Sequence, residues 1–261
     1  MTKKFLNVAI EASQKAGKLI IDLFYKDIEI TTKPDQSIIT EADLKADTII
    51  RSIIYENFPS HDVLSEESGR SNHSSEYLWI IDPLDGSTNF SVRNPFIAVS
   101  IGLLRRDHPL LGVVYSPFQD ELFRAEINRG AFLNNKPISV DEKVAFENAF
   151  LAFDNGRDLH SRNKMIQIYK RLKARNNKVR QVGAAALELC YVASGRFGAF
   201  IAPGLNSWDI LAGELIVKEA NGLTTDFQNN SFTLTSSNII ASSHSLHPIL
   251  LDIVKDLPRK D

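Results

Sequence analysis

The chain contains the stretch Trp79-Ile80-Ile81-Asp82-Pro83-Leu84-Asp85-Gly86-Ser87-Thr88-Asn89-Phe90, an apolar strand that ends in two carboxylates, a proline, a glycine and hydroxyls. Pro83 fixes its own φ and stiffens the turn, so Asp82, Asp85 and the Leu84 carbonyl can converge on one hard cation. The next three residues are typical of the first turn of a helix, where unpaired N–H groups bind phosphate. A simple helix cap formed by Asp85 or Ser87 after a buried strand explains the same residues equally well.

Composition sets broad bounds on the class of protein. With 261 residues and 43% hydrophobic content, the chain can bury a full core, either as one large domain or as two closely packed halves, residues 1–145 and 146–261. The formal charge of −2 disfavours a general polyanion binder, so we expect no nucleic-acid partner. A single cysteine, Cys190, excludes an internal disulfide framework, and no apolar run is long enough for a membrane span. We therefore expect a cytoplasmic protein without a membrane partner.

The N-terminal part predicts two helices joined by a polar loop. Apolar residues recur at helical spacing over 5–23, and residues 31–37 are typical of an exposed loop whose notable cation is Lys33. A second helix is predicted to begin near Thr40, and Thr40 and Asp43 have the spacing of a capping pair. A solvated surface lysine and an ordinary cap would account for these residues without any function.

The remainder predicts two sheets of different kinds. Strand-like runs separated by turns predict an antiparallel meander behind the two helices, at residues 97–104, 110–115, 121–127 and 130–133. Beyond residue 145, short strands alternate with helices, which indicates a second sheet with helical crossovers. The predicted strands are 149–153, 179–181 and 199–201, and the predicted helices are 162–173, 185–193 and 210–220.

Two further places supply carboxylates. A short strand at residues 63–65 leads into Glu66 and Glu67, of which only one can face a given site because adjacent strand residues point to opposite faces. Asp209 follows Trp208 at the start of a predicted helix, where the helix dipole favours an aspartate. Taken singly, these are surface glutamates and an ordinary first-turn aspartate.

The whole stretch 79–90 resembles the signature of the inositol monophosphatase family, the Mg²⁺-dependent, lithium-sensitive phosphatases. Three other segments match that family in the same order along most of the chain, namely Glu66-Glu67, Gly183-Ala184-Ala185-Ala186 and Trp208–Gly213. The resemblance implies an α+β fold with a layered αβαβα arrangement, an antiparallel N-terminal sheet and a mixed C-terminal sheet. It also implies a homodimer.

The resemblance further implies which residues hold metal ions. Glu66, Asp82 and the Leu84 carbonyl would hold a first Mg²⁺, and Asp82, Asp85 and Asp209 a second, with a weak third ion near Glu66. Converging carboxylates repel each other and a phosphate ester, so bound cations must offset their charge. Ligands that are all oxygen favour Mg²⁺, or Mn²⁺ as the alternative, over zinc.

The resemblance also implies catalytic and substrate-binding residues. Ser87, supported by Asp43 and Thr40, would orient a metal-activated water with Glu66 as base, and Lys33 would approach the phosphate. The N–H groups of Gly86 and Ser87 would bind phosphate oxygens. The substrate pocket would be lined by Asp85, Gly183, Ala184, Ala185, Ala186 and Ala202.

The expected activity is hydrolysis of a small phosphate monoester, inositol monophosphate, to inositol and phosphate. Inositol-specific members carry an acidic residue where this chain has Ala202, which accepts no hydrogen bond from a hydroxyl, so a broad substrate range is expected. Fructose 1,6-bisphosphate, histidinol phosphate and 3′-phosphoadenosine 5′-phosphate remain alternative substrates. A regulator associated with RNA or RNA polymerase is the alternative from another class.

Overall fold

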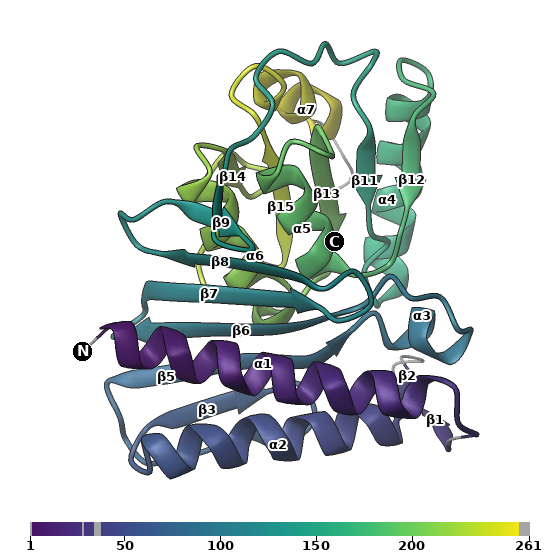
Figure 1. Cartoon of the computed structure of the whole chain (residues 1–261). Helices are drawn as coiled ribbons and strands as arrows, with labels where there is room; N and C mark the ends of the chain where they lie inside the picture. Colours follow the sequence, from purple (N-terminus) through teal and green to yellow (C-terminus); the bar gives the residue numbers. More distant parts are fainter. Residues whose placement is uncertain (1, 28, 34–37, 256–261) are drawn as a thin grey trace.

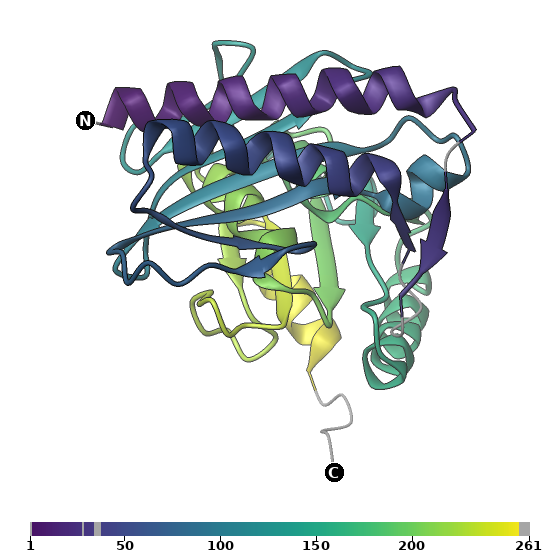
Figure 2. The same ribbon diagram turned by 90° about the horizontal axis from the view of Figure 1, so that it is seen from below.

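Two long helices cover one face of the larger sheet. The computed structural model describes residues 2–27, 29–33 and 38–255. Helices α1 (Thr2–Phe24) and α2 (Glu41–Asn57) pack against each other and against the strands beneath them (Figures 1 and 2). Both helices confirm the prediction. None of the helices in these residues is long and apolar enough to cross a lipid bilayer.

Eight strands of the described residues form the larger sheet. They are β3 (Asp62–Ser65), β4 (Gly69–Arg70), β5 (Tyr77–Asp85), β6 (Ala98–Arg105), β7 (His108–Ser116), β8 (Glu121–Glu126), β9 (Ala131–Leu133) and β10 (Lys136–Ile138). Their order is β10-β9-β8-β7-β6-β5-β3-β4, and only β3 and β5 pair in parallel among them. The predicted meander is therefore confirmed as β6 to β9.

The smaller sheet is mixed, as expected from the alternation of strands and helices. It comprises β11 (Leu151–Phe153), β12 (Val179–Gln181), β13 (Ala199–Pro203), β14 (Leu223–Thr225) and β15 (Asn238–Ser242). The order is β12-β11-β13-β15-β14, with β11 parallel to both of its neighbours and β15 antiparallel to both of its own.

Helices separate and flank the two sheets. The helices α5 (Ala185–Ala193) and α6 (Ser207–Glu219) are almost wholly buried between the sheets, and α4 (Leu159–Lys173) and α7 (His247–Val254) pack against the outer face of the smaller sheet (Figure 1). The layers thus run α, β, α, β, α. The fold class expected from the sequence is confirmed.

The loop predicted at residues 31–37 differs in part from the structure. Strand β1 (Ile30–Thr32) pairs with β2 (Ile38–Thr40) as an antiparallel pair, whereas residues 34–37 lie outside the described residues. Three-residue strands are too short to give an alternating apolar pattern, and β1 is exposed along its length. The sequence therefore carried no signal for this pair of strands.

Candidate active site

Strand β5 carries Asp82 and Asp85 on either side of a β-bulge. Asp82 pairs with Ser100 and Asp85 pairs with Ala98 on β6, so β5 has one residue more than its partner over this interval. Residues three apart on a regular strand face opposite sides, and the extra residue brings both carboxylates to the same side. Pro83, which lacks an N–H, is tolerated at a bulge. The turn expected at Pro83 is thus a bulge within a continuing strand.

Two other elements bring carboxylates to Asp82. Ser65 pairs with Ile81 on the parallel strand, so Glu66, the next residue, lies beside Asp82. Asp209 comes from the first turn of α6, where its Oδ2 accepts the Asn206 N–H at 2.7 Å. One carboxylate oxygen from each of Glu66, Asp82 and Asp209 lies within 4.8 Å of the others. The arrangement offers a cation three oxygen ligands from distant parts of the chain.

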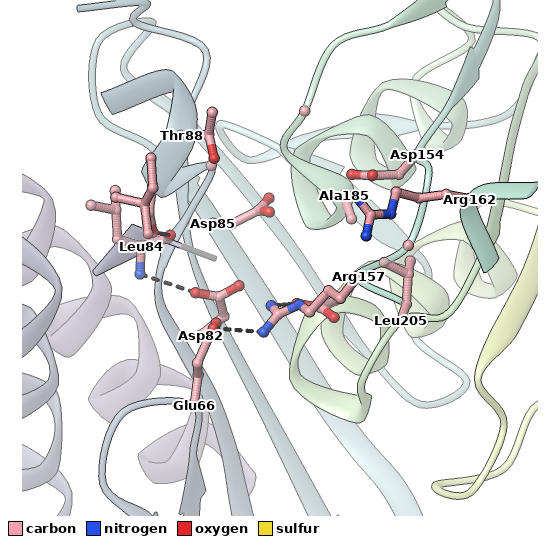
Figure 3. Close-up of a pocket in the computed structure, with 16 residues that line it drawn as sticks. Glu66, Asp82, Leu84, Asp85, Thr88, Asp154, Arg157, Arg162, Ala185 and Leu205 are labelled. Carbon is pink, nitrogen blue, oxygen red and sulfur yellow. Dashed lines mark hydrogen bonds and ion pairs between the residues drawn. The ribbon is translucent and has the colours of Figure 1, made fainter. Parts of the chain in front are cut away.

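These carboxylates line a cavity of about 290 Å³. Leu84 and Asp85 line the same cavity, and the Asp85 Oδ2 accepts the Leu187 N–H of α5 at 3.1 Å. Figure 3 shows Asp82, Asp85 and Leu84 on one wall, with Asp154, Arg162, Ala185 and Leu205 opposite them. The volume is at the small end of the roughly 300–1,000 Å³ found for small-molecule sites.

Burial and mutual repulsion raise the pKa values of Asp82, Asp85 and Asp209. Burial is the main cause for Asp82, followed by the charges of Glu66, Asp85 and Asp209. Burial likewise raises the pKa of Asp85 well above its usual value and the pKa of Asp209 to about 7. A bound cation would favour the ionised form of each group. Because the available ligands are carboxylate and carbonyl oxygens, the set suits Mg²⁺.

Ser87 is fixed by a hydrogen-bond chain that begins at the cap of α2. Its Oγ donates to Asp43 Oδ1 at 2.6 Å, while the Thr40 N–H and hydroxyl both donate to Asp43 Oδ2. Burial raises the pKa of Asp43, and the bonds from Ser87 and Thr40 partly offset that rise. Thr40 and Asp43 therefore form the expected cap and also hold Ser87 in the cavity wall. With its proton directed to Asp43, the Ser87 Oγ can accept a hydrogen bond from water.

Lys33 is not a solvated surface lysine. Its Nζ lies 2.7 Å from Glu67 Oε1 and 3.2 Å from Glu66 Oε1, and its side chain is partly buried. Glu67 does not line the cavity, and Lys33 links it to Glu66, which does. The position of Lys33 thus places a positive charge beside the carboxylates.

Gly86 allows the chain to turn from β5 into the short helix α3 (Ser87–Ser91). Its φ is +92°, and an added Cβ would lie 3.1 Å from the Phe96 carbonyl oxygen and 3.2 Å from both the Gly183 oxygen and the Ala184 Cβ. Asn89 donates to the carbonyls of Val182 and Gly183. The motif is therefore in direct contact with the segment that precedes α5.

The predicted pocket residues 183–186 divide into two groups. Gly183 and Ala185 line the cavity, whereas Ala184 and Ala186 are buried behind its wall. Ala202 is fully buried on β13 and packs in the core between the sheets. Its methyl group is not part of the cavity wall.

Comparisons with known proteins agree with this geometry. A model of the family described as "Inositol monophosphatase family" matches residues 1–259. The chain belongs to the inositol monophosphatase family. Members of this family are phosphatases, and the family is metal-dependent.

The relatives carry two kinds of name. Inositol monophosphatase 2 of Solanum lycopersicum is 38% identical over 262 residues, covering 97% of this chain and 99% of the relative. The Nus factor SuhB of Vibrio cholerae is 39% identical over 243 residues, covering 91% of each. The crystal structure of the extragenic suppressor protein suhB from Bartonella henselae superimposes with a TM-score of 0.92 at 33% identity, covering 97% of this chain and 99% of that one.

Arg157 also lies at this site, and sequence reasoning missed it. Its Nη1 lies 3.0 Å from Glu66 Oε1 and its Nη2 lies 3.3 Å from Asp209 Oδ1. Although burial lowers the pKa of Arg157, the charges of Asp209 and Glu66 raise it above its usual value. The guanidinium thus offsets part of the acidic charge.

Asp154 and Arg162 also line the cavity and were not predicted. Burial raises the pKa of Asp154, while the N–H groups of Asn155 and Gly156 and the charge of Arg157 lower it. The available signal was the same as at residues 79–90, because the buried strand β11 passes directly into the polar run Asp154-Asn155-Gly156-Arg157-Asp158.

Proposed function

We propose that this protein is a Mg²⁺-dependent phosphomonoesterase that hydrolyses inositol monophosphate to inositol and inorganic phosphate. The observation that carries the proposal is the convergence of Glu66, Asp82 and Asp209 within 4.8 Å in one cavity. Membership of the inositol monophosphatase family supports phosphatase chemistry at that cavity.

Glu66, Asp82 and the Leu84 carbonyl would hold one ion, and Asp82, Asp85 and Asp209 a second, with a third near Glu66. Bound Mg²⁺ supplies positive charge for the phosphate oxygens and lowers the pKa of water. Because Arg157 now contacts Glu66 and Asp209, its guanidinium must leave these oxygens for an ion to take them.

The side chains around Ser87 would position the attacking water. Ser87 Oγ would accept a hydrogen bond from the water, and Glu66 would take the water's other proton as the water oxygen bonds to phosphorus. The bond from phosphorus to the inositol oxygen breaks, and that oxygen takes up a proton from a water molecule and leaves as the hydroxyl of inositol. The N–H groups of Gly86 and Ser87 would bind two phosphate oxygens. Lys33, beside Glu66, would add a positive charge near the same phosphate.

The test is phosphate release from a substrate panel in the presence of Mg²⁺. The panel comprises inositol 1-phosphate, glycerol 2-phosphate, fructose 1,6-bisphosphate, histidinol phosphate and 3′-phosphoadenosine 5′-phosphate. We expect inositol 1-phosphate to give the highest kcat/KM and chelator to abolish release. Release that persists in chelator would disprove the metal-dependent reaction, and a higher kcat/KM for another ester would assign the alternative substrate.

We further propose inhibition by Li⁺ at about millimolar concentration, which rests on the family resemblance. A monovalent ion bound among the carboxylates leaves part of their negative charge unneutralised, whereas the divalent Mg²⁺ would offset it. The measurement is a Li⁺ titration of phosphate release at several Mg²⁺ concentrations. Full activity at about tens of millimolar Li⁺ would refute the proposed inhibition without contradicting the proposed hydrolysis.

A second candidate function is a regulator that binds RNA or RNA polymerase, because a relative at 39% identity is named Nus factor SuhB. The formal charge of −2 does not favour broad binding to RNA. Binding of purified polymerase or structured RNA at physiological salt, retained in Asp82→Asn, would support this role. Absence of binding under these conditions would reject it.

A further inference from the structure

We propose that Asp154 and Arg162 form a hydroxyl-binding subsite that recognises the polyol part of the substrate. This inference rests on the proposed function, because it assigns the leaving group of the same reaction. It concerns two residues on the cavity wall opposite the metal-binding carboxylates (Figure 3).

The fold fixes Asp154 in that wall. Asp154 directly follows β11, and its N–H donates to the Ile201 carbonyl at 3.2 Å, so it continues the parallel pairing and lies beside Ala202. Gly156 has a φ of +70°, and a Cβ there would lie 2.3 Å from the Pro203 carbonyl oxygen. The loop is therefore pressed against β13, and Asp154 has little freedom to move away.

The carboxylate of Asp154 is oriented toward the cavity. The Asn155 N–H donates to Oδ1 at 2.6 Å, which restrains the group, and Figure 3 shows the carboxylate pointing inward, with Arg162 on the same wall of the cavity. Arg162 comes from the first turn of α4 and is exposed, so it stands at the mouth of the cavity. One residue offers hydrogen-bond acceptors and the other offers donors.

A hydroxyl group suits this pair because it donates one hydrogen bond and accepts others. A phosphate dianion beside Asp154 would meet a like charge, so the phosphate belongs at the opposite end with the cations and the N–H groups of Gly86 and Ser87. Ala185 and Leu205 line the wall near the pair and can pack against the C–H groups of a ring (Figure 3). The chemistry recognised is therefore an uncharged, hydroxyl-bearing leaving group.

The pair also accounts for hydroxyl recognition despite Ala202. Ala202 is fully buried and offers no acceptor, while the neighbouring strand supplies Asp154 at the adjacent register position. The acidic acceptor thus reaches the cavity from β11 instead of β13. A chain with this arrangement should favour polyol esters over esters whose leaving group lacks hydroxyls.

The experiment compares kcat/KM for inositol 1-phosphate and for p-nitrophenyl phosphate, whose leaving group has no second hydroxyl, in Asp154→Asn and Arg162→Met. Asparagine keeps the acceptor for the Asn155 N–H but replaces the charged acceptor in the cavity. We expect Asp154→Asn to lower kcat/KM for inositol 1-phosphate about tenfold, mainly through KM, because a hydrogen bond to a charged group becomes a neutral one. The value for p-nitrophenyl phosphate should change less than about twofold.

The double variant and two surface controls sharpen this comparison. If both side chains bind the same hydroxyl, the combined loss should be smaller than the product of the single losses. Asp252→Asn and Lys170→Met make the same chemical changes at exposed positions on α7 and α4, and should leave both substrates unaffected. Equal losses for the two substrates would indicate a displaced loop and overturn the subsite, as would no loss for either.

A binding measurement separates this inference from the proposed function. Saturation-transfer NMR would follow myo-inositol with wild-type protein in Mg²⁺ and inorganic phosphate, with Asp154→Asn as the comparison. We expect saturation-transfer signals from myo-inositol with the wild-type protein, and a dissociation constant about tenfold higher for the variant. If wild-type protein releases phosphate from no ester, the proposed function fails, whereas an absence of myo-inositol binding, or equal binding by both proteins, refutes the subsite.

Discussion

Asp82 is the residue on which the acidic cluster depends most, since it lies next to Glu66, Asp85 and Asp209. We expect Asp82→Asn to lower kcat/KM at least about 100-fold. Loss of a residue that only hydrogen-bonds a metal ligand already lowers activity about 10- to 100-fold, and this substitution would remove a charged ligand itself. Steady-state phosphate release with varied Mg²⁺ measures the effect. Unlike most core changes, the substitution should not lower the melting temperature in chelator, because it removes a buried charge repelled by its neighbours.

The control for Asp82→Asn is Asp107→Asn, in the exposed turn between β6 and β7. Asp107 has a φ of +64°, which asparagine tolerates, so this variant should keep full activity and stability. An Asp82→Asn protein that is fully active and folded would show that the cluster is not the metal site.

Ser87 tests the hydrogen-bond chain from α2. Ser87→Ala removes the donor to Asp43 Oδ1 and should lower kcat about 100-fold, the scale expected when an attacking water is no longer held in position. It should also lower the free energy of unfolding by about 1–3 kcal/mol, because a buried carboxylate oxygen loses its partner. Rates and urea unfolding measure the two effects. Ser91→Ala on the same short helix is the control, and an equal loss of rate there would point to α3 as a whole.

At the scale of elements, the bulge in β5 and the turn at Gly86 hold the site against α5. Gly86→Ala places a Cβ about 3.1–3.2 Å from the Phe96 and Gly183 carbonyl oxygens, at a φ of +92°. We expect a loss of about 1–3 kcal/mol in the free energy of unfolding from the strained backbone alone. Denaturant titration measures it.

The control for Gly86→Ala is Gly69→Ala in the exposed strand β4. Gly69 also has a positive φ, +71°, but no atom lies within 4 Å of its hypothetical Cβ. Its loss of stability should come from the backbone only and be smaller, with activity retained. If the two variants unfold alike and Gly86→Ala keeps full activity, the contact between the motif and residues 183–184 does not position the site.

At the scale of the whole molecule, the buried acids couple stability to pH and to metal. Burial raises the pKa of Asp209 from 3.8 to about 7, and it also raises the pKa values of Asp82 and Asp85. Between the unfolded and folded pKa values the folded chain binds more protons than the unfolded chain, so stability falls as pH rises. In chelator we therefore expect the melting temperature to fall from pH 5 to 8.

Mg²⁺ should reverse this trend, because a bound cation favours the ionised carboxylates. Each group that titrates in the window contributes about 1.4 kcal/mol per pH unit. Thermal unfolding at pH 5, 6, 7 and 8, with Mg²⁺ or with chelator, gives the comparison. A Mg²⁺ effect that did not grow with pH would mean that the ion binds elsewhere.

The expected homodimer is a further prediction at this scale. Analytical ultracentrifugation should give twice the mass of the chain at micromolar concentration. A monomer at that concentration would contradict the expectation without affecting the active site, since the carboxylates of the cavity all come from one chain.

Much of the fold and of the candidate metal site could be predicted from local sequence patterns. The helices, the meander and the second sheet follow from apolar periodicity, which is a property of neighbouring residues. The stretch 79–90 indicated cation and phosphate chemistry because its carboxylates, proline and glycine are close in the chain. Glu66 and Asp209 needed the family resemblance, since nothing in their immediate surroundings separates a ligand from a surface glutamate or a helix-start aspartate.

Long-range pairing determined the rest. The bulge that turns Asp82 and Asp85 to one side depends on the register between β5 and β6, and Glu66 reaches Asp82 through the parallel pairing of β3 with β5. Asp154 and Arg157 enter the cavity because β11 pairs with β13 and α6 packs between the sheets. Local chemistry specifies what a side chain can bind, but its neighbours in space depend on strand register and helix packing between residues far apart in the chain.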